Sequence, residues 1–302
     1  MKTIVICGAT ATGKSELAVS LAKEIDAEII NADSMQLYRG MDIGTAKLDI
    51  SERGGIEHHL LDVLDVTEDA TVAWYQSKAR QVISEIHARG KSVVIVGGTG
   101  LYIKAILDEL NFPDTDPQVR ERLNSEAEEF GVATLFARLQ LLDPAAAAAI
   151  DIQNVRRVIR ALEVIEITGQ PFTANLPREA SSKYPDALQF GLVMDREKLT
   201  ERIDARVDLM WKKGLVQEVD SLISLGITQG TTARRALGYA QIIAMRAGEM
   251  SEALANEETK RATRQYARRQ ETWFSRDARI QWISPVQARL ETVLQKINSI
   301  SK

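Results

Sequence analysis

The sequence of 302 residues has little of what secreted or membrane proteins need. It holds one cysteine, Cys7, which excludes an intramolecular disulfide and a cysteine-rich zinc site. It has no apolar run near the roughly 18 residues that span a membrane, and its first apolar run, Ile4–Cys7, is too short for a signal peptide. These absences predict a cytoplasmic protein that does not bind a membrane.

Charge is distributed unevenly along the chain. The net charge of −4 argues against a protein that coats nucleic acid non-specifically. Residues 1–150 hold 14 Lys and Arg against 23 Asp and Glu, whereas residues 151–302 hold 24 against 19. The basic residues of the second half gather in Arg156–Arg160 and Lys260–Arg279. Local basic patches on an acidic chain suit a specific polyanion.

The hydrophobic pattern predicts an α/β fold with a helical insertion. Short β-type runs alternate with helical spacing, as in βαβ units that build a parallel sheet. The expected strands are Thr3–Cys7, Glu28–Asp33, His58–Asp65, Ser92–Val96, Leu188–Met194 and Arg279–Ser284. Prolines at 113 and 117 interrupt this pattern, and the chain from there to Thr168 has helical character. We therefore expect a core of residues 1–112 and 188–302, whose C-terminal part is mostly helical, and a helical insertion domain at 113–187.

Residues 8–15, GATATGKS, fit the phosphate-binding pattern G-x-x-x-x-G-K-[ST] between an expected strand and an expected helix. Glycines let successive backbone N–H groups turn inward, and the N-terminus of the helix adds positive potential. Lys14 contributes a full charge, and the Ser15 hydroxyl can ligate Mg²⁺. The sequence therefore predicts a phosphate or diphosphate site, made of Gly8, Ala9, Thr10, Ala11, Thr12, Gly13, Lys14 and Ser15.

The acidic residue expected near this loop is Asp33, and it ends a different strand from the metal-binding Asp of ATPases and GTPases. Those enzymes usually end a further core strand with a metal-binding Asp. Here Ser92–Val96 runs into Gly97-Gly98-Thr99, and Asp33 ends the second expected strand. In an open α/β sheet both Asp33 and Thr99 face the crevice at the carboxyl ends of the strands. A carboxylate there suits a general base, although Asp33 as a turn residue and Thr99 as a helix cap are the plainer interpretations.

Two transfer chemistries remain open from the residues alone. One is a P-loop kinase, with Asp33 deprotonating a small alcohol or a nucleoside. The other is a transferase in which diphosphate leaves and the loop stabilises its charge. A non-enzymatic RNA-binding module is a third hypothesis, which gives Asp33 and Thr99 no role.

Longer motifs point to one family. Asn31–Lys47 reads NADSMQLYRGMDIGTAK and Val96–Tyr102 reads VGGTGLY. RVIRALEV, RALGYAQ and RQYARRQETWF follow at Arg157–Val164, Arg235–Gln241 and Arg264–Phe274. In this order, over nearly the whole chain, they resemble the bacterial tRNA dimethylallyltransferase family. The resemblance implies a P-loop NTPase-like core. It also implies transfer of a dimethylallyl group from dimethylallyl diphosphate to N6 of adenosine 37, in tRNAs that read codons starting with U. A monomer is expected, although no motif carries that expectation.

The resemblance also implies residue roles. Asp33 is the general base, Thr99 assists it, and Arg235 contacts the diphosphate. The GATATGKS loop holds the leaving group, with Mg²⁺ at Ser15. The helical insertion clasps the anticodon stem-loop of the tRNA. The residues expected to contact tRNA are Asp33, Ser34, Met35, Gln36, Thr99, Arg120, Arg156, Arg157 and Arg160.

Other conspicuous residues receive plainer interpretations. Lys260, Arg264 and Arg268 recur at i, i+4 and i+8, which predicts a phosphate-binding stripe, while Trp273 and Phe274 are expected in the core. His58 and His59 are expected to be structural. Asp42 and Lys47 belong to the long motif, and polar packing of their loop is the expectation. Gly100 stands where some relatives carry a bulkier residue, which is expected to alter the pocket but not the chemistry.

Overall fold

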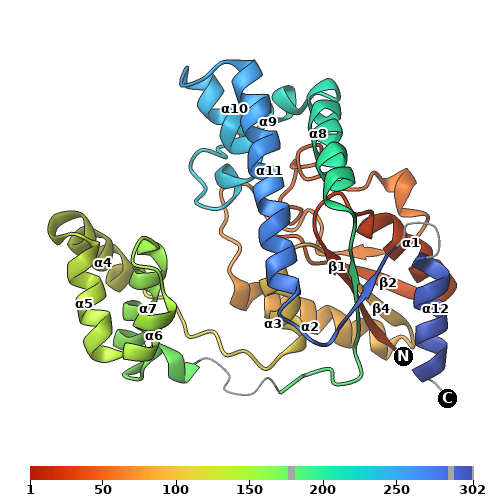
Figure 1. Ribbon diagram of the computed structural model, residues 1–302, viewed down its shortest axis with the longest axis horizontal. Helices are drawn as coiled ribbons and strands as arrows, with labels where there is room; N and C mark the ends of the chain where they lie inside the picture. The colour runs from red at the N-terminus through yellow and green to blue at the C-terminus, as the bar shows by residue number, and fades with distance from the viewer. Residues whose placement is uncertain (176–180, 285–288, 301–302) are drawn as a thin grey trace. The chain divides into compact units, whose positions relative to one another are not determined.

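The computed structural model describes residues 1–175, 181–284 and 289–300 and divides into two compact units (Figure 1). The larger unit consists of Met1–Leu107 and Tyr184–Lys302, and the smaller unit is Asp108–Lys183. The helical insertion predicted at 113–187 overlaps the smaller unit, with both of its predicted boundaries a few residues later in the chain.

The larger unit is built on a six-stranded sheet in the order β3-β2-β4-β1-β5-β6, and every pair of neighbouring strands is parallel. The α/β fold with a parallel sheet is therefore confirmed. The strands are β1 (Thr3–Gly8), β2 (Ala27–Asn31), β3 (His58–His59), β4 (Ser92–Val96), β5 (Leu188–Leu192) and β6 (Ile280–Ile283).

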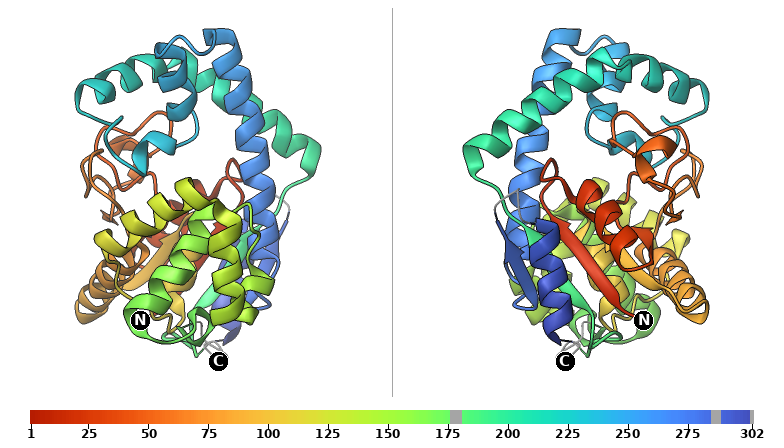
Figure 2. Two further views of the ribbon diagram at one scale, coloured as in Figure 1. Left: turned by 90° about the vertical axis from the view of Figure 1, so that its left-hand side faces the viewer. Right: turned by 90° about the vertical axis from the view of Figure 1, so that its right-hand side faces the viewer.

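Helices cover both faces of this sheet (Figure 2). They include α1 (Lys14–Glu24), α2 (Val72–Ala88), α3 (Gly100–Leu107), α11 (Glu252–Phe274) and α12 (Arg289–Ile300). Side chains alternate between the two faces of a strand, so Ile4 and Ile6 of β1 pack with α1 and α12. Val5 and Cys7 pack with α2 and α3 on the opposite face. Burial raises the pKa of the Cys7 thiol to about 12, so this cysteine is a core residue without reactivity at neutral pH.

Four predicted strands end earlier than expected, and two of these differences affect the site. The strand expected at His58–Asp65 forms only over His58–His59, and an isolated bridge joins Leu64 to Tyr38 further along. Leu60 and Asp62 have φ values of 61° and 56°, a left-handed conformation that extended backbone does not contain. Likewise β2 ends at Asn31, so Asp33 lies in the loop after the strand rather than at its last position.

The remaining elements of the larger unit stand between β5 and α11, apart from η1 (Ile50–Arg53), a short 3₁₀ turn. They are α8 (Arg196–Lys212), α9 (Leu215–Ser224), η3 (Ala233–Arg235) and α10 (Tyr239–Arg246). Helix α8 packs along α11, and two ion pairs join them: Lys260 to Asp208 at 2.8 Å and Arg264 to Asp204 at 2.5 Å.

The smaller unit is helical and has its own core. Its elements are α4 (Pro117–Phe130), α5 (Val132–Leu142), α6 (Pro144–Ala149), α7 (Val155–Thr168) and η2 (Phe172–Asn175). Leu123, Leu139 and Leu162 are among the side chains that meet in this core. Asp143 caps α6 and also accepts a hydrogen bond from the Thr173 backbone N–H at 2.8 Å, which ties η2 to the bundle.

Candidate active site

The loop between β1 and α1 has the backbone that the GATATGKS motif requires. Gly8 has a φ of 130°, and a Cβ at this position would lie 2.6 Å from the carbonyl oxygen of Leu192 on β5. Gly13, with a φ of 86°, directly precedes α1. Both positions therefore need glycine. Gly8 needs it because of its positive φ and its close packing on β5, and Gly13 because of its positive φ alone. Together they turn the loop from the strand into the N-terminus of the helix.

Gln270 of α11 supports this loop from the side. Its Oε1 accepts a hydrogen bond from the Thr10 backbone N–H at 2.8 Å, and its Nε2 donates to the Gly98 carbonyl oxygen at 2.9 Å. Within the loop, the Thr12 hydroxyl donates to the Ala9 carbonyl oxygen at 2.8 Å. Ala9 and Thr12 are buried by these contacts, so they shape the loop from inside rather than line its concave side.

The loop borders two adjoining cavities. The larger has a volume of about 790 Å³ and the smaller about 290 Å³. Gly13, Lys14 and Ser15 line the larger one, whereas apolar side chains such as Ile203, Val207 and Leu237 line much of the smaller. Both cavities share Thr10, Ala11, Asp33, Thr45, Arg206 and Met210. A polar compartment that suits phosphates is thus continuous with one that suits a hydrocarbon chain.

Cations surround the loop in the larger cavity. Lys14 Nζ donates to the Ala9 carbonyl oxygen at 2.6 Å. Burial lowers the pKa of Lys14 to about 8; Arg206 adds to this effect and Asp33 opposes it. Burial likewise lowers the pKa of Arg206, with Asp33 again acting in the opposite direction. Charges held this close without full solvation favour an anionic ligand.

Asp33 is the one carboxylate that lines both cavities among the residues described. Asn31 fixes the loop that carries it. The Asn31 Oδ1 accepts from the Asp33 N–H at 2.9 Å, and the Asn31 Nδ2 donates to the Asp33 carbonyl oxygen at 2.9 Å. The Asp33 Oδ1 accepts a hydrogen bond from the Met35 N–H at 3.0 Å, so Asp33 does have the turn role of the plainer interpretation. That bond occupies one carboxylate oxygen, and a second oxygen remains for a substrate proton.

Thr99 lies behind Asp33. Its hydroxyl accepts a hydrogen bond from the Ser34 N–H at 3.1 Å and also contacts the Tyr266 hydroxyl. Burial, together with the charge of Asp33, raises the pKa of Tyr266 to about 12, so this phenol stays protonated at neutral pH. Thr99 is not part of the lining of either cavity as described, which indicates that it acts on Asp33 through Ser34.

The other predicted site residues of the larger unit are distributed between the cavities. Ser34, Met35 and Arg235 line the smaller one, and Gln36 lines the larger. Sequence reasoning missed Arg202 and Arg206, which come from α8 and line the larger cavity. Their i, i+4 spacing is the only local signal, and it is common on solvated helix faces.

The loop at residues 42–47, which forms the end of the motif Asn31–Lys47, is held by side chains on two sides. Lys47 Nζ contacts Asp42 at 2.6 Å, Asp62 at 2.5 Å and the Tyr38 carbonyl oxygen at 3.0 Å, and its side chain is only 3% exposed. From α9, the Glu218 carboxylate accepts hydrogen bonds from the backbone N–H groups of residues 42, 43 and 44. Residues 42–47 line the larger cavity almost without interruption, so these contacts set its wall. The expectation of polar loop packing is therefore confirmed, with specific partners.

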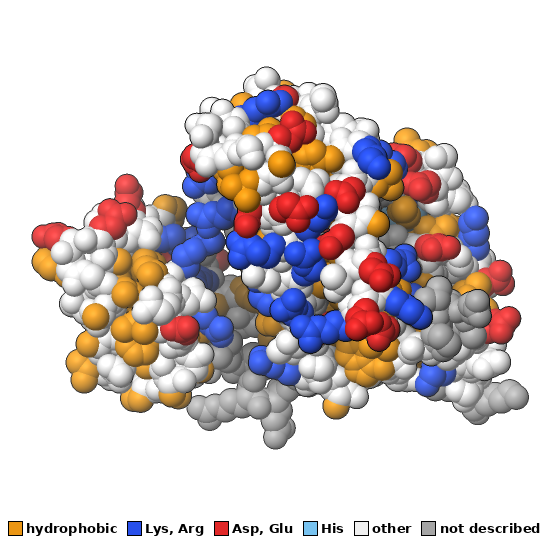
Figure 3. All heavy atoms as spheres, turned by 45° about the horizontal axis from the view of Figure 1, so that its top comes forward, with side chains coloured by type: hydrophobic (Ala, Val, Ile, Leu, Met, Phe, Trp, Pro, Cys, Tyr) orange, Lys and Arg blue, Asp and Glu red, His pale blue; other side chains and the backbone are white. Residues whose placement is uncertain are grey.

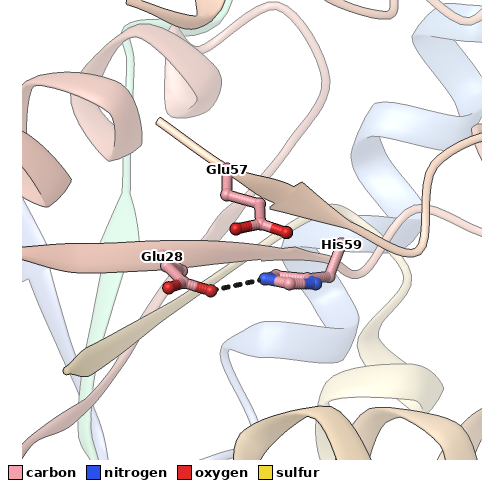
Figure 4. Close-up of side chains that lie close together, drawn as sticks. All are labelled: Glu28, Glu57 and His59. Carbon is pink, nitrogen blue, oxygen red and sulfur yellow. Dashed lines mark hydrogen bonds and ion pairs between the residues drawn. The ribbon is translucent and has the colours of Figure 1, made fainter. Parts of the chain in front are cut away.

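His58 and His59 occupy β3 and have structural partners, as expected. His58 Nδ1 lies 2.8 Å from the Ile56 carbonyl oxygen, and His59 Nε2 lies 2.7 Å from Glu28. Figure 4 shows Glu28, Glu57 and His59 close together, a grouping of metal-ligand type. Glu28 is already paired with Arg89 at 2.6 Å and Lys91 at 3.4 Å. Burial raises its pKa, but the hydrogen bonds from His59 and Arg89 outweigh that effect and hold the pKa below its usual value, as in a structural ion-pair network.

The arginines expected to contact tRNA lie in the smaller unit. Arg120 and Arg160 both pair with the fully buried Glu163, at 2.7 and 2.8 Å. Arg160 also donates to the carbonyl oxygens of residues 113 and 114, which fixes the start of the unit. Arg156 and Arg157 are exposed in the first turn of α7. Two of the four arginines therefore have a structural role, and two present their side chains to solvent.

The basic stretch of α11 is only partly available for a ligand. Lys260 and Arg264 pair with Asp208 and Asp204 of α8, so the predicted stripe faces another helix for part of its length. Figure 3 shows acidic and basic side chains intermixed over the face that carries α11. Phe274 is 3% exposed, as expected for a core residue, but Trp273 is 43% exposed. The indole lies against Gly100, which is not part of the described lining of either cavity, so the expected effect of Gly100 on the pocket is not seen.

Comparison with known proteins decides which transfer chemistry fits this site. A family model described as IPP transferase matches residues 36–277. The chain belongs to the IPP transferase family. A protein of Thermobifida fusca named tRNA dimethylallyltransferase is 58% identical over 94% of this chain and 90% of its own length. One of Streptomyces griseus with the same name is 55% identical over 93% and 90%.

Solved structures agree with this assignment. A tRNA isopentenylpyrophosphate transferase from Bacillus halodurans aligns with a TM-score of 0.73 and 38% identity, over 99% of this chain and 96% of its own. A eukaryotic dimethylallyltransferase acting on tRNA aligns with a TM-score of 0.78 and 29% identity, over 90% and 69%. As an IPP transferase the chain is a prenyl-transferring enzyme, and the kinase alternative finds no support among these relatives. No helix among the described residues has the length and apolar character of a membrane span.

Proposed function

We propose that this IPP transferase moves the dimethylallyl group of dimethylallyl diphosphate to N6 of adenosine 37 in tRNAs that read codons starting with U. The observation that carries the proposal is the position of Asp33, which borders the polar cavity and the apolar cavity at once. A carboxylate at that junction stands where a prenyl carbon leaves its diphosphate and meets a nucleophile.

The step balances with the groups present. The bond between C1 of the prenyl group and the diphosphate oxygen breaks, and a bond between C1 and N6 forms. The diphosphate keeps the electron pair, and the N6 proton passes to the Asp33 carboxylate. General base catalysis of this kind contributes about 10²–10⁴-fold in rate.

The leaving group would be held by the loop at the start of α1. Lys14, Arg202 and Arg206 face the same cavity and would neutralise the charge that develops on diphosphate. Arg235 lines the smaller cavity and not the larger one, so the contact with diphosphate expected of it stays a prediction.

Ser15 fits an Mg²⁺ ligand. It lines the larger cavity, and among the described residues its hydroxyl has no hydrogen-bond partner. Bound there, Mg²⁺ would supply further neutralisation of the diphosphate.

The smaller unit would bind the anticodon stem-loop through Arg156 and Arg157, whose exposed side chains suit phosphate oxygens. Arg120 and Arg160 would present the donors that Glu163 and, for Arg160, the carbonyl oxygens of residues 113 and 114 leave free, because a guanidinium carries five N–H groups. Adenosine 37 must leave the stack of the loop to reach Asp33. The expectations of a monomer and of a cytoplasmic location stay predictions.

The test is transfer of label from radioactive dimethylallyl diphosphate to unmodified tRNA in the presence of Mg²⁺. Label on adenosine 37 with the native chain, and a loss of about 10²–10⁴-fold in rate with Asp33→Ala, supports both the reaction and the base. Asp33→Asn is the matched variant, since it keeps the acceptor for the Met35 N–H but cannot take a proton. Native turnover by Asp33→Asn contradicts the assignment of the base. Absence of label on tRNA contradicts the function.

A further inference from the structure

Arg289, the first residue of α12, lies directly behind the diphosphate loop. Its Nη1 donates to the Thr12 carbonyl oxygen at 2.5 Å, and its Nη2 donates to the Val193 carbonyl oxygen at 3.1 Å. A Cβ at Gly13 would lie 3.5 Å from the same Nη1. One guanidinium therefore joins the loop after β1, the residue after β5 and the start of the last helix.

The charge of Arg289 is poorly compensated within the described part of the chain. The side chain is buried, with the residue only 6% exposed, and both of its described hydrogen-bond partners are neutral carbonyl oxygens. Among the described residues, its Nε is buried without a hydrogen-bond partner. Burial lowers its pKa, with Arg202 acting in the same direction and Glu16 in the opposite one. A buried cation without a matched anion is costly, so an anion bound in the adjacent loop would lower that cost.

The hydrogen bond from Arg289 to the Thr12 carbonyl oxygen also orients the peptide between Thr12 and Gly13. The C=O and N–H groups of a trans peptide point to opposite sides of the chain. When Arg289 holds the Thr12 carbonyl oxygen, the N–H of Gly13 in the same peptide points away from Arg289. Gly13, Lys14 and Ser15 line the larger cavity, so this is the side on which a phosphate would lie.

We propose that Arg289 is a positioning residue for the diphosphate. It orients the Thr12–Gly13 peptide toward the ligand and supports the bound negative charge from behind the loop. The inference rests on the proposed function, because it takes diphosphate as the ligand of the GATATGKS loop. It assigns a role in substrate binding to the last helix of the chain, which the sequence motifs do not reach.

The test compares two substitutions of the same residue in the full chain. Arg289→Lys keeps the charge and loses one of two hydrogen bonds, whereas Arg289→Gln keeps a donor and loses the charge. Lys296→Gln is the control, because Lys296 lies on the same helix but donates to Gln281 of β6 at 2.9 Å, away from the loop. The probe is inorganic diphosphate with Mg²⁺, titrated calorimetrically, and thermal unfolding of each variant is measured alongside.

We expect Arg289→Gln to weaken diphosphate binding about ten-fold or more, as for loss of a charged hydrogen bond, and Arg289→Lys to weaken it less. The KM for dimethylallyl diphosphate rises accordingly, the KM for tRNA does not, and Lys296→Gln changes neither. Reduced thermal stability with native affinity in both Arg289 variants overturns the inference, since the residue then only anchors α12. If Arg289→Gln does not fold, unchanged affinity and KM in Arg289→Lys overturn it. If the native chain does not bind diphosphate, the proposed function fails first.

Discussion

The Thr99 hydroxyl accepts a hydrogen bond from the Ser34 backbone N–H at 3.1 Å. The Thr99 N–H in turn donates to the Ala32 carbonyl oxygen at 3.1 Å. Two bonds therefore tie the loop after β4 to the residues on both sides of Asp33. The position of the proposed base depends on a residue that does not line the cavities as described.

This relationship predicts a difference between two substitutions of Thr99. Thr99→Ser keeps the acceptor oxygen, and we expect its single-turnover rate of label transfer to stay within a few-fold of native. Thr99→Val keeps the shape but leaves the Ser34 N–H without its acceptor, at a cost of about 1–3 kcal/mol in the local structure. We expect a fall of about ten-fold or more in that rate. Equal rates for the two variants would show that the hydrogen bond does not matter.

Arg206 should contribute more to the reaction rate than Lys213, another cation of the same cavity. It lines both cavities, whereas Lys213 lines only the larger one. Loss of a preorganised donor to a developing charge costs about 10²–10³ in kcat. We expect Arg206→Gln to show a loss of that order, and Lys213→Gln a change of only a few-fold, in steady-state assays. Comparable losses in the two variants would mean that general positive potential, rather than the place of Arg206, supports the reaction.

The lowered pKa of Lys14, about 8, predicts two opposite pH effects. Diphosphate affinity falls as pH rises through about 8, because the free protein then loses the Lys14 charge. The free energy of unfolding contributed by this group rises with pH between about 8 and 10.5, because the unfolded chain binds more protons in that window. Calorimetry and chemical denaturation across this range measure both effects.

Lys14→Arg is the control for the pH prediction. Arginine stays protonated throughout the window, so both slopes should flatten. A native pH profile in this variant would assign the titration to another group.

The sequence predicts those features of the site that depend on residues close together in the chain, and it does not predict those that depend on the tertiary structure. The GATATGKS motif carries its own backbone geometry, because glycine at 8 and 13 meets the positive φ values there. Helix α8 carries no such signal, since Arg206 resembles any charged residue on a helix until the fold places it beside Asp33. In the same way, the periodicity that predicted a stripe on α11 could not show that Asp204 and Asp208 lie opposite it.

Glu218 should control how well the substrate is held rather than the chemical step. Its carboxylate accepts hydrogen bonds from three successive N–H groups, 42 to 44, and from the Tyr239 hydroxyl. Glu218→Gln brings an NH₂ group against these donors. We expect a higher KM with a smaller change in kcat, and a loss of about 1–3 kcal/mol in unfolding free energy.

The matched variant for this prediction is Asp220→Asn on the same helix. Asp220 pairs with Arg246 at 2.5 Å near the protein surface. Such surface pairs contribute about 0–1 kcal/mol, so this change should leave KM unaltered. A fall in kcat alone for Glu218→Gln would place the residue in the chemical step instead.

The packing of Trp273 on Gly100 has a consequence for how such chains diversify. A Cβ at position 100 would lie 2.1 Å from the indole, so no side chain fits there while the indole keeps its place. The two positions, 173 residues apart, must therefore change together. An enzyme of this fold with a larger residue at 100 should carry a smaller one at 273, and exchanging only one of the pair between such enzymes should impair both.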